Sequence, residues 1–445
     1  MRHTFTATLG PQDAKRHIEH SFRLDAPAQE LRITLRHADG TQVVRGQGLA
    51  NMLTLTVFDP NGLRGEGHRM GARLAEGIRV HEVLLSEASA TLGYAAGPLP
   101  QGAWRVIVNT HRITGATPCE YTLTIEADTQ PHSGAGKWLR GDFHAHTAHS
   151  DGHWHAEDLI AHALERKLDF QALTDHNTLA GVASFERACT GRIIPLGGLE
   201  LTTFYGHAMA LGIRHAVSWH LQAGYDMRGA AEATRNAGGL FIIAHPHAPG
   251  DPFCTGCDWA YADLMPGDAP AVEVWNGEWR EEDGQNEKGL QLYYSWLNQG
   301  YRLIATAGTD IHGPYLAGQR PGFNVVYARC NNAQGVLTAA RAGHLFVSCG
   351  PHLELTAQSS TGATGMMGDT LDGALTRLDV SWRDASANHI LRVIVNGAVA
   401  HEQPVAARGE LTWKAAGRAA RWAAIEMRHS DGALEVLTNP VFVTE

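Results

Sequence analysis

The chain has 445 residues, of which 44% are hydrophobic and 18% are charged, a composition typical of soluble globular proteins and not of disordered chains. Its formal net charge of −10 argues against a general nucleic-acid binder and against a protein of anionic membrane surfaces, because both need basic surface. Beyond about 250–300 residues a single hydrophobic core stops growing, so the length predicts two or three domains.

Residues 1–130 are expected to form an all-β domain. Apolar and polar residues alternate over 53–62, 104–110 and 121–127, a pattern typical of half-buried strands, and turn signals separate these runs. Because we find no convincing long helix in this segment, we predict a β-sandwich. Residues 131–137 belong to a stretch rich in small residues and are expected to form a linker.

The pattern changes at Trp138, where short apolar runs begin to alternate with segments of helical period. Seven strands with intervening helices favour a (β/α) barrel or a related parallel architecture over residues 138–349. The expected strands are 141–146, 170–176, 193–200, 207–213, 240–246, 272–276 and 302–310, and the expected helices are 156–168, 227–239 and 286–300.

After residue 350 the β pattern returns, and we expect residues 350–445 to form a small C-terminal β domain resembling a sandwich. Its expected strands are 377–382, 390–397, 421–429 and 433–443.

Histidine is unusually frequent, with 26 copies in the chain, and half of them fall between His144 and His312. Neutral imidazole is the commonest side-chain metal ligand. The six cysteines are scattered. Cys254 and Cys257 form a CxxC without a second pair at zinc-ribbon spacing, so we expect a loop with two free thiols and not a metal or redox site.

Potential metal ligands close six of the seven expected strands, at the end where barrel enzymes place their active sites. His144 and His146 lie two apart, so on a strand both rings face the same side. Asp310 and His312 have the same spacing. Glu200 closes a very apolar run, where a carboxylate is costly to bury unless it is paired or bound to a metal.

The remaining strand ends are less decisive. Asp175 and His176 are adjacent and point to opposite faces, so we expect His176 to be a ligand and Asp175 to orient a neighbour, although the same residues could form a helix-capping turn. His207 opens its expected strand instead of closing it. His245 lies in the sequence AHPH, where His247 is its rival.

The motifs DFHAHTAHSDG, LTDHN, GGLE, AHP and GTDIHG, in this order, resemble the PHP (polymerase and histidinol phosphatase) superfamily over residues 138–349. With its flanking β segments the chain resembles the CehA/McbA-type branch. The resemblance implies a distorted (β/α)7 barrel and two to three divalent transition-metal ions. It also implies one ion on His144, His146, Glu200 and Asp310, a second on Glu200, His207 and His245, and a third on Asp151, His176 and His312.

Imidazole and carboxylate ligands suit Zn, Mn or Fe(II). We therefore expect a metal-dependent hydrolase whose multinuclear centre activates a hydroxide. The expected catalytic residues are Asp310, His176 and Asp175, and the expected substrate contacts are Arg320, Asn276 and His149.

The leading hypothesis is a phosphoesterase acting on phosphate mono- or diesters. A carbamate or carboxylic ester hydrolase with the same metal site is the alternative, which aromatic residues near the strand ends keep open. A non-catalytic metal-binding protein is disfavoured, because a structural zinc site needs only about four ligands. The aromatic residues are Phe204, Tyr205, Trp275, Trp279 and Tyr315.

No apolar stretch reaches the ~18–20 residues of a membrane span, and the N-terminus MRHTFTATLG has no basic region followed by an apolar core. We therefore expect a cytoplasmic protein with a small-molecule ester as substrate, without a membrane or nucleic-acid scaffold as partner. A homo-oligomer is left open.

Overall fold

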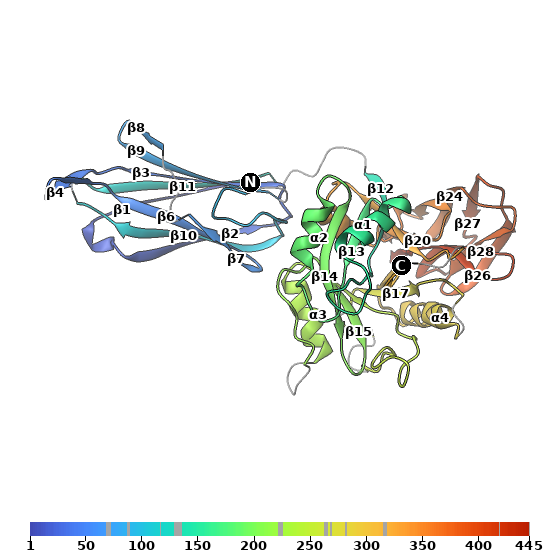
Figure 1. Cartoon of the computed structure of the whole chain (residues 1–445). Coiled ribbons are helices and arrows are strands. Elements are labelled where there is room, and N and C mark those ends of the chain that lie inside the picture. The colour runs from blue at the N-terminus through green and yellow to red at the C-terminus, as the bar shows by residue number, and fades with distance from the viewer. Residues whose placement is uncertain are drawn as a thin grey trace. The chain divides into compact units, whose positions relative to one another are not determined.

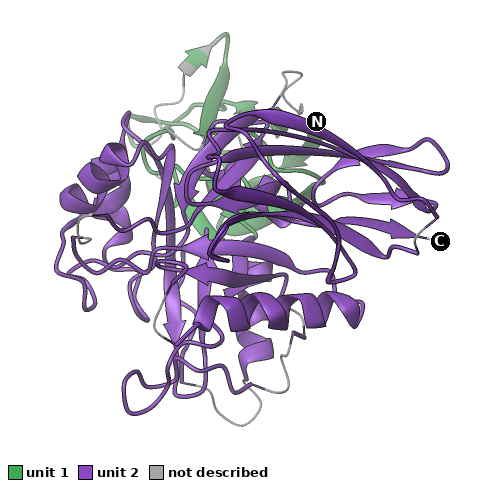
Figure 2. Ribbon diagram, turned by 90° about the vertical axis from the view of Figure 1, so that its right-hand side faces the viewer, with its two compact units in different colours: residues 1–133 green, residues 134–445 purple. Residues whose placement is uncertain are grey.

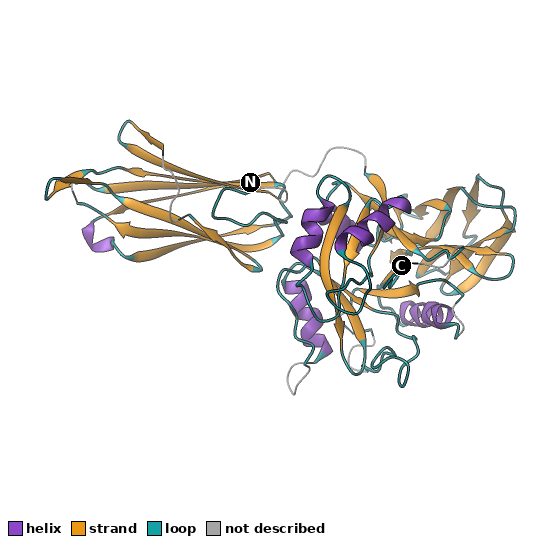
Figure 3. Ribbon diagram, in the orientation of Figure 1, coloured by secondary structure: helices purple, strands orange, loops and turns teal. Residues whose placement is uncertain are grey.

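The computed structural model describes residues 1–67, 73–86, 90–115, 117–128, 136–220, 226–261, 266–267, 269–280, 283–314, 318–417 and 419–444. Contacts divide the chain into two compact units, residues 1–133 and 134–445, which are coloured separately in Figure 2. Strands dominate both units (Figure 3). No helix in the described part has the length and apolar character of a membrane span.

The first unit consists of antiparallel strands in two main sheets (Figure 1). One sheet has the order β1 (Arg2–Leu9), β11 (Cys119–Asp128), β3 (Glu30–Ala38), β9 (Ile78–Ser86) and β8 (Arg73–Ala75). The other has the order β2 (Arg16–Leu24), β10 (Gly102–Arg112), β6 (Met52–Asp59) and β7 (Gly62–Glu66). A hairpin of β4 (Gln42–Val44) and β5 (Gln47–Leu49) and a short 3-10 helix η1 (Pro11–Asp13) complete the unit.

Alternating side chains build the core of this unit. On β3, Leu31, Ile33 and Leu35 are fully buried, and on β10, Val106 and Val108 join the same cluster. Residues two apart on a strand share a face, so each sheet turns its apolar face toward one common core. The strands expected from alternation over 53–62, 104–110 and 121–127 are present as β6, β10 and β11.

The second unit begins with seven neighbouring strands, one for each expected strand and in the expected order. They are β12 (Lys137–Asp142), β13 (Phe170–Leu173), β14 (Ile194–Thr202), β15 (His207–Leu211), β16 (Leu240–Ile243), β17 (Ala271–Asn276) and β18 (Ile304–Gly308). The helices of this unit are α1 (Ala156–Glu165), α2 (Val182–Cys189), α3 (Met227–Asn236), α4 (Gln285–Asn298) and α5 (Ala333–Arg341).

This part of the sheet is mixed, because β15 runs antiparallel to both β14 and β16. The other four neighbouring pairs, which lie within β12–β14 and β16–β18, are parallel. The turn from Thr203 to Gly206 joins β14 directly to β15, and such a short connection cannot cross over to a parallel strand. The chain therefore has a mixed α/β fold in which strand and helix do not alternate regularly.

The sheet continues from β12 into the C-terminal part of the chain. The region expected to form a separate domain from residue 350 shares one compact unit with the region before it. The added strands are β19 (Phe323–Ala328), β20 (Leu345–Ser348), β29 (Leu434–Thr438), β28 (Trp422–His429), β25 (His389–Val395) and β26 (Ala398–Pro404), with β23 (Thr370–Asp372) and β30 (Val441–Thr444) at the side. A further sheet has the order β22 (Thr364–Met366), β21 (His352–Ser359), β24 (Leu375–Arg383) and β27 (Gly409–Lys414).

Candidate metal centre

The segments that follow β12 and β18 lie side by side and carry the first ligands. Ala145 and Ile311 form a parallel bridge, and the His146 amide donates to the Ile311 carbonyl at 2.9 Å. The Asp310 amide donates to the His144 carbonyl at 2.9 Å, and a positive φ of 51° at Asp310 ends the extended backbone there. The two pairs of ligands spaced two apart are thereby brought to one place.

Asp142, at the end of β12, fastens these segments together. Its carboxylate accepts hydrogen bonds from the His144 amide at 3.1 Å, the Thr309 amide at 3.0 Å and the Thr309 hydroxyl at 2.5 Å. The carboxyl is buried, and burial raises its pKa despite these hydrogen bonds. Asp142 therefore positions the ligands on either side of it.

A first cluster consists of His144, His146, Glu200 and Asp310, whose ligand atoms all lie within 4.8 Å of one another. Asp310 Oδ1 lies 3.0 Å from His146 Nε2 and 3.3 Å from His144 Nε2. Glu200 Oε2 lies 3.4 Å from the same two nitrogens. These are the four residues that the family resemblance implies for one ion.

A second cluster uses the other oxygen of Glu200. Oε1 lies 3.0 Å from His207 Nδ1 and 3.2 Å from His245 Nε2. Glu200 is fully buried, and its two oxygens face two different sets of histidines. A carboxylate in this position can bridge two ions.

A third cluster lies at the exposed edge of the centre. Asp151 Oδ1 is 3.1 Å from His312 Nε2, and Asp151 Oδ2 is 3.5 Å from His176 Nε2. His146 also belongs to this cluster. The side chains of Asp151 and His312 are 59% and 35% exposed, so this side of the centre is open to solvent.

The donors of the centre fit metal ions better than they fit one another. Among the described residues, Nε2 of His144 and Nε2 of His146 are buried without a partner in hydrogen-bond geometry. Glu200 Oε2 lies 2.8 Å from Nδ1 of His176. Buried polar atoms without a partner cost free energy, and an ion coordinated by them removes that cost. Imidazole nitrogen with carboxylate oxygen is a donor set for Zn, Mn or Fe(II).

The charges of the centre favour a cation as well. Burial alone would raise the pKa of Glu200, but His144, His176 and His207 hold the pKa of this carboxyl well below its usual range. Burial would likewise raise the pKa of Asp310, which His144 and His146 hold well below its usual range. Both carboxylates are therefore ionised at neutral pH.

Two of the remaining expected site residues, Asp175 and Asn276, have well-defined partners. Asp175 accepts from the Thr147 amide and hydroxyl and from the Ser150 hydroxyl, each at 2.7 Å, so it holds the turn that leads to Asp151. Asn276 donates from Nδ2 to Glu273 Oε2 at 3.1 Å and to Asp310 Oδ2 at 3.4 Å. Asn276 thus contacts one ligand of the first cluster, Asp310, and the neighbouring carboxylate of Glu273.

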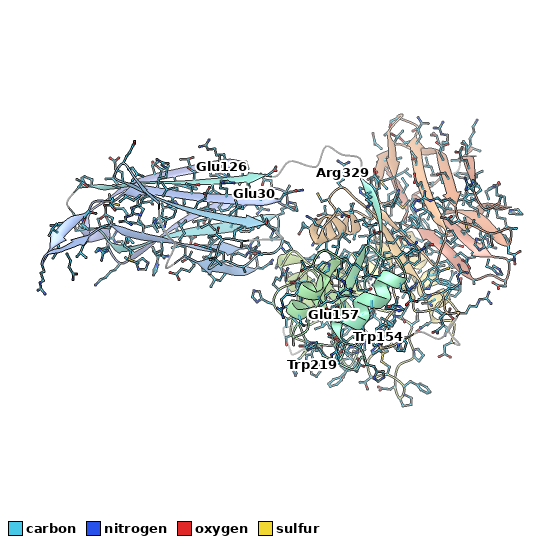
Figure 4. The ribbon with its side chains drawn as sticks, turned by 45° about the horizontal axis from the view of Figure 1, so that its top comes forward. Glu30, Glu126, Trp154, Glu157, Trp219 and Arg329 are labelled. Carbon is cyan, nitrogen blue, oxygen red and sulfur yellow. A yellow bond between two sulfur atoms is a disulfide. The ribbon has the colours of Figure 1, made fainter. Side chains whose placement is uncertain are left out.

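The other expected substrate contacts lie elsewhere. The Arg320 guanidinium donates to Glu435 Oε2 at 3.0 Å, so its charge is already paired. His149 is exposed on the turn that follows His146, and Trp154 and Glu157, labelled in Figure 4, lie where this segment leads into α1.

The structure also separates the rival histidines and the aromatic residues. His245 belongs to the second cluster, whereas the backbone of His247 pairs with Asp258. Phe204 and Tyr205 are each 62% exposed on the turn between β14 and β15. Trp275 and Trp279 are buried in the core, and Tyr315 lies outside the described residues.

Sequence reasoning missed Glu273, although the signal was available. This buried carboxylate lies on β17, whose six residues are all buried. Glu273 Oε1 is 3.1 Å from His144 Nδ1, and Oε2 accepts from the His245 amide at 3.1 Å. Glu200 was chosen because a carboxylate within an apolar strand is costly to bury unless it is paired or bound to a metal. The same reasoning applies to Glu273, which lies in the apolar run VEVWN.

The expectation of two free thiols in the CxxC was wrong, because Cys254 and Cys257 form a disulfide. The Cys254 amide donates to the Gly250 carbonyl at 3.3 Å, which turns the loop back on itself. The Cα atoms of the two cysteines come to 5.5 Å, within the range that a disulfide spans.

Three clusters of imidazole and carboxylate donors, joined through Glu200 and His146, define a candidate multinuclear metal centre at the ends of a mixed sheet. Residues 142–256 match the family model described as the PHP domain. The chain therefore contains a PHP domain, which confirms the resemblance to this superfamily. The CehA/McbA-type branch stays a prediction.

Solved structures similar to this chain share little sequence with it. A two-domain protein from Bacteroides vulgatus, containing a predicted PHP-like metal-dependent phosphoesterase, is 15% identical with a TM-score of 0.43, over 69% of this chain and 96% of its own. An amidohydrolase from Chromobacterium violaceum with bound sulfate and no metal is 19% identical with a TM-score of 0.29, over 39% of this chain and 88% of its own.

A protein from Bifidobacterium adolescentis, assigned as a metal-dependent phosphoesterase, is 17% identical with a TM-score of 0.31, over 40% of this chain and 91% of its own. A comparison with curated proteins found no match.

Proposed function

We propose that this protein is a metal-dependent hydrolase whose centre holds two to three divalent transition-metal ions. One observation carries the proposal: Glu200 is fully buried and divides its two oxygens between His144 and His146 on one side and His207 and His245 on the other. A structural metal site needs about four ligands and no bridge. A shared carboxylate is what a catalytic pair of ions requires.

Ions bound at such a centre lower the pKa of water to near neutrality and stabilise negative charge on the substrate. The protein supplies orientation. Glu273 lies against Nδ1 of His144, and when that nitrogen donates to it, Nε2 presents its lone pair to the first cluster. The Nδ1 of His312, 2.8 Å from the Asp310 carbonyl, can be fixed in the same way, which leaves Nε2 facing Asp151.

The exposed third cluster supports entry of the substrate from the side of Asp151 and His312. We also propose that β12–β18 form a distorted seven-stranded barrel. The bridge between Ala145 and Ile311 supports this, because it joins the segments that follow the first and the last of the seven strands.

For the substrate we propose a phosphate mono- or diester, on the basis of the PHP domain. A carbamate or carboxylic ester is the second candidate, and two observations favour it. Arg320, the basic residue expected to meet a phosphate, is paired with Glu435. Phe204 and Tyr205 stand exposed four and five residues after the bridging Glu200 and could contact an apolar acyl or aryl group.

A substrate panel separates these candidates. Metal-stripped protein would be loaded in turn with Mn, Zn and Fe(II) and assayed on p-nitrophenyl phosphate, bis-p-nitrophenyl phosphate, and p-nitrophenyl or naphthyl esters and carbamates. We expect hydrolysis of phosphate substrates only in the presence of metal. Metal-dependent turnover confined to the carboxylic esters or carbamates would transfer the proposal to the second candidate, and hydrolysis without metal would contradict both.

A further inference from the structure

The CxxC loop, residues 250–258, contains the disulfide between Cys254 and Cys257 and contacts His207 of the second cluster. Within this loop the Cys257 amide donates to the Cys254 carbonyl at 3.4 Å, and the Thr255 hydroxyl donates to Asp251 at 3.3 Å. Thr255 and Gly256 form the tip between the two cysteines. The sequence motif that the proposed hydrolase does not use thus lies beside one of its ligands.

His207 stands between the loop and the metal centre. Its Nδ1 is 3.0 Å from Glu200 Oε1 and 4.0 Å from Cys257 Sγ. Its Nε2 is 3.1 Å from the Thr255 carbonyl, and a hydrogen bond donated there leaves the lone pair on Nδ1. The same nitrogen therefore faces both a carboxylate of the centre and a sulfur of the loop.

The two sulfurs and the imidazole are close enough to share one ion. Sγ of Cys254, Sγ of Cys257 and a ring nitrogen of His207 lie within 4.8 Å of one another. Two thiolates and one imidazole are a soft donor set that suits Zn²⁺, unlike the oxygen-rich donors of the first cluster. Three protein ligands leave the fourth tetrahedral position open.

Contacts other than the disulfide hold the loop in place. Gly256 has a φ of +78°, and a Cβ at this position would collide with the Thr203 carbonyl. The Trp259 amide donates to the Pro246 carbonyl at 3.2 Å, and the Ala260 amide donates to the Tyr205 carbonyl at 2.7 Å. Because these contacts do not involve sulfur, the cysteines stay beside His207 when the disulfide is opened.

The disulfide can be reached from solvent at one end. Cys254 is half-buried, and its neighbour Phe253 is 85% exposed. Cys257 is buried beneath the loop, next to His207. A reducing thiolate would therefore attack Cys254 and release Cys257 as the leaving thiol.

We propose that reduction of the Cys254–Cys257 disulfide creates a thiolate metal site, formed by both cysteines and His207, that takes a soft divalent cation such as Zn²⁺. An external dithiol supplies the two electrons and two protons. The S–S bond breaks, two thiols form, and the dithiol becomes a disulfide. Binding of the ion then releases the two thiol protons.

The new site competes with the second cluster. One imidazole nitrogen coordinates one ion, so an ion held at His207 Nδ1 by the thiolates takes this ligand from Glu200 and His245. The redox state of the loop thus determines whether His207 coordinates an ion together with the two thiolates or together with Glu200 and His245. The inference does not rest on the proposed hydrolase activity, because the thiolate site is detected without a substrate.

Co²⁺ serves as the probe, because Co²⁺ bound to thiolate shows an intense near-ultraviolet charge-transfer band. The full-length, metal-stripped protein would be titrated with Co²⁺ in its oxidised form and after dithiothreitol treatment and anaerobic removal of the reductant. We expect the band to reach the intensity of one thiolate-bound Co²⁺ per chain in the reduced protein and to be absent from the oxidised protein. Absence of the band from the reduced protein would overturn the proposal.

Variants identify the ligands. The Cys254→Ser/Cys257→Ser double variant should lack the band in both states, whereas Cys330→Ser, which replaces a cysteine outside the loop, should keep it. His207→Ala should weaken Co²⁺ binding by the reduced protein at least about tenfold. A band that persists in the double variant, or an affinity unchanged by His207→Ala, would contradict the assignment.

Discussion

Buried histidines occur in both units of the chain, and their neighbours differ. In the first unit, His37 on β3 and His81 on β9 stack with ring centroids 5.3 Å apart, and their Nε2 atoms are 3.2 Å apart. In the described part, no carboxylate lies at ion-pair distance from either ring. Burial, followed by the charges of His37 and Arg79, lowers the pKa of His81 to about 4, so this histidine is neutral at pH 7.

In the second unit the same residue type has carboxylate neighbours. Burial would lower the pKa of His245, but Glu200, Asp310 and Glu273 raise it to about 9. The comparison shows that buried histidines alone do not make a metal site. Ionised carboxylates, which give the site negative charge and bridging oxygens, distinguish the centre around Glu200 from the pair formed by His37 and His81.

The largest expected effect comes from removing the charge of Glu200. Glu200→Gln keeps the shape of the side chain but removes the carboxylate that joins the first and second clusters. We expect loss of at least one bound ion and a fall in kcat/KM of about a thousandfold or more, because bound ions contribute several kcal/mol to catalysis. Metal analysis and steady-state kinetics on the best substrate of the panel measure both.

Glu186→Gln is the matched control, because Glu186 on α2 pairs with Arg214 outside the three clusters. It should keep wild-type metal content and activity. Equal metal content in Glu200→Gln and wild type would show that Glu200 is not a ligand. It would also contradict the idea that carboxylates distinguish this centre from the histidine pair of the first unit.

The second prediction concerns the pH dependence of the first unit. The pKa of His81 is about 4 in the fold, against an ordinary value of 6.5, so below about pH 6.5 the unfolded chain binds a proton that the folded chain does not. The contribution of His81 to the free energy of unfolding is fully present above that pH and is lost as the pH falls toward 4. At about 1.36 kcal/mol per pH unit, the loss reaches about 3 kcal/mol.

Cys119 reports on this unit, because it is buried on β11 and is the single cysteine before residue 133. Its reaction with dithiodipyridine in urea, read by peptide mass spectrometry and normalised to the fully unfolded chain, gives the free energy of unfolding at each pH. His81→Phe should reduce the loss between pH 6.5 and 4. An unchanged pH profile in this variant would assign the effect to other groups.

The third prediction tests how a carboxylate outside the bridge acts on a ligand. Glu273→Gln weakens the contact with His144 Nδ1, which lies 3.1 Å from the carboxylate. Carboxylates that orient a ligating histidine typically contribute 10–100-fold to metal affinity, so we expect a loss of about 10–100-fold in Mn²⁺ or Zn²⁺ affinity with the stoichiometry retained. Calorimetric titration measures it, and wild-type affinity in the variant would show that His144 is oriented without Glu273.

The smallest expected effect concerns Arg320, which lies outside the carboxylate-rich centre and is paired with Glu435. Arg320→Met should change kcat/KM for phosphate esters by less than about threefold, because the guanidinium charge is already compensated. Kinetics of the folded variant on phosphate and carboxylic esters provide the comparison. A loss of about a hundredfold confined to phosphate esters would instead place Arg320 on the substrate.

The sequence predicted the seven strands β12–β18 because each combines a short apolar run with a turn signal. It placed several strand ends too late: β12 ends at Asp142 and β16 at Ile243, just before the ligands begin. His245 and Asp310 have positive φ values of 23° and 51°, a backbone conformation that apolar periodicity does not reveal. Helix α5 was missed because Gly335, a residue of low helix propensity, lies within it. In the structure, Asn332 stabilises its first turn by accepting a hydrogen bond from the Gly335 amide.

The candidate ligands could be chosen from sequence because strand-end histidines and carboxylates follow a family order, and the structure brings all nine together. The contacts of Arg320 with Glu435 and of Cys257 with His207 could not be foreseen, since they join residues 115 and 50 positions apart. Such contacts depend on how distant segments meet, which local patterns do not determine.

The central claim, that the cluster around Glu200 holds ions needed for hydrolysis, is tested most directly by metal reconstitution. Metal-stripped wild type would be titrated with Mn²⁺ while bound metal and hydrolysis are measured on the same samples. We predict that two to three equivalents bind and that activity returns as the bridged first and second clusters fill. Fully active protein without bound metal would contradict the account.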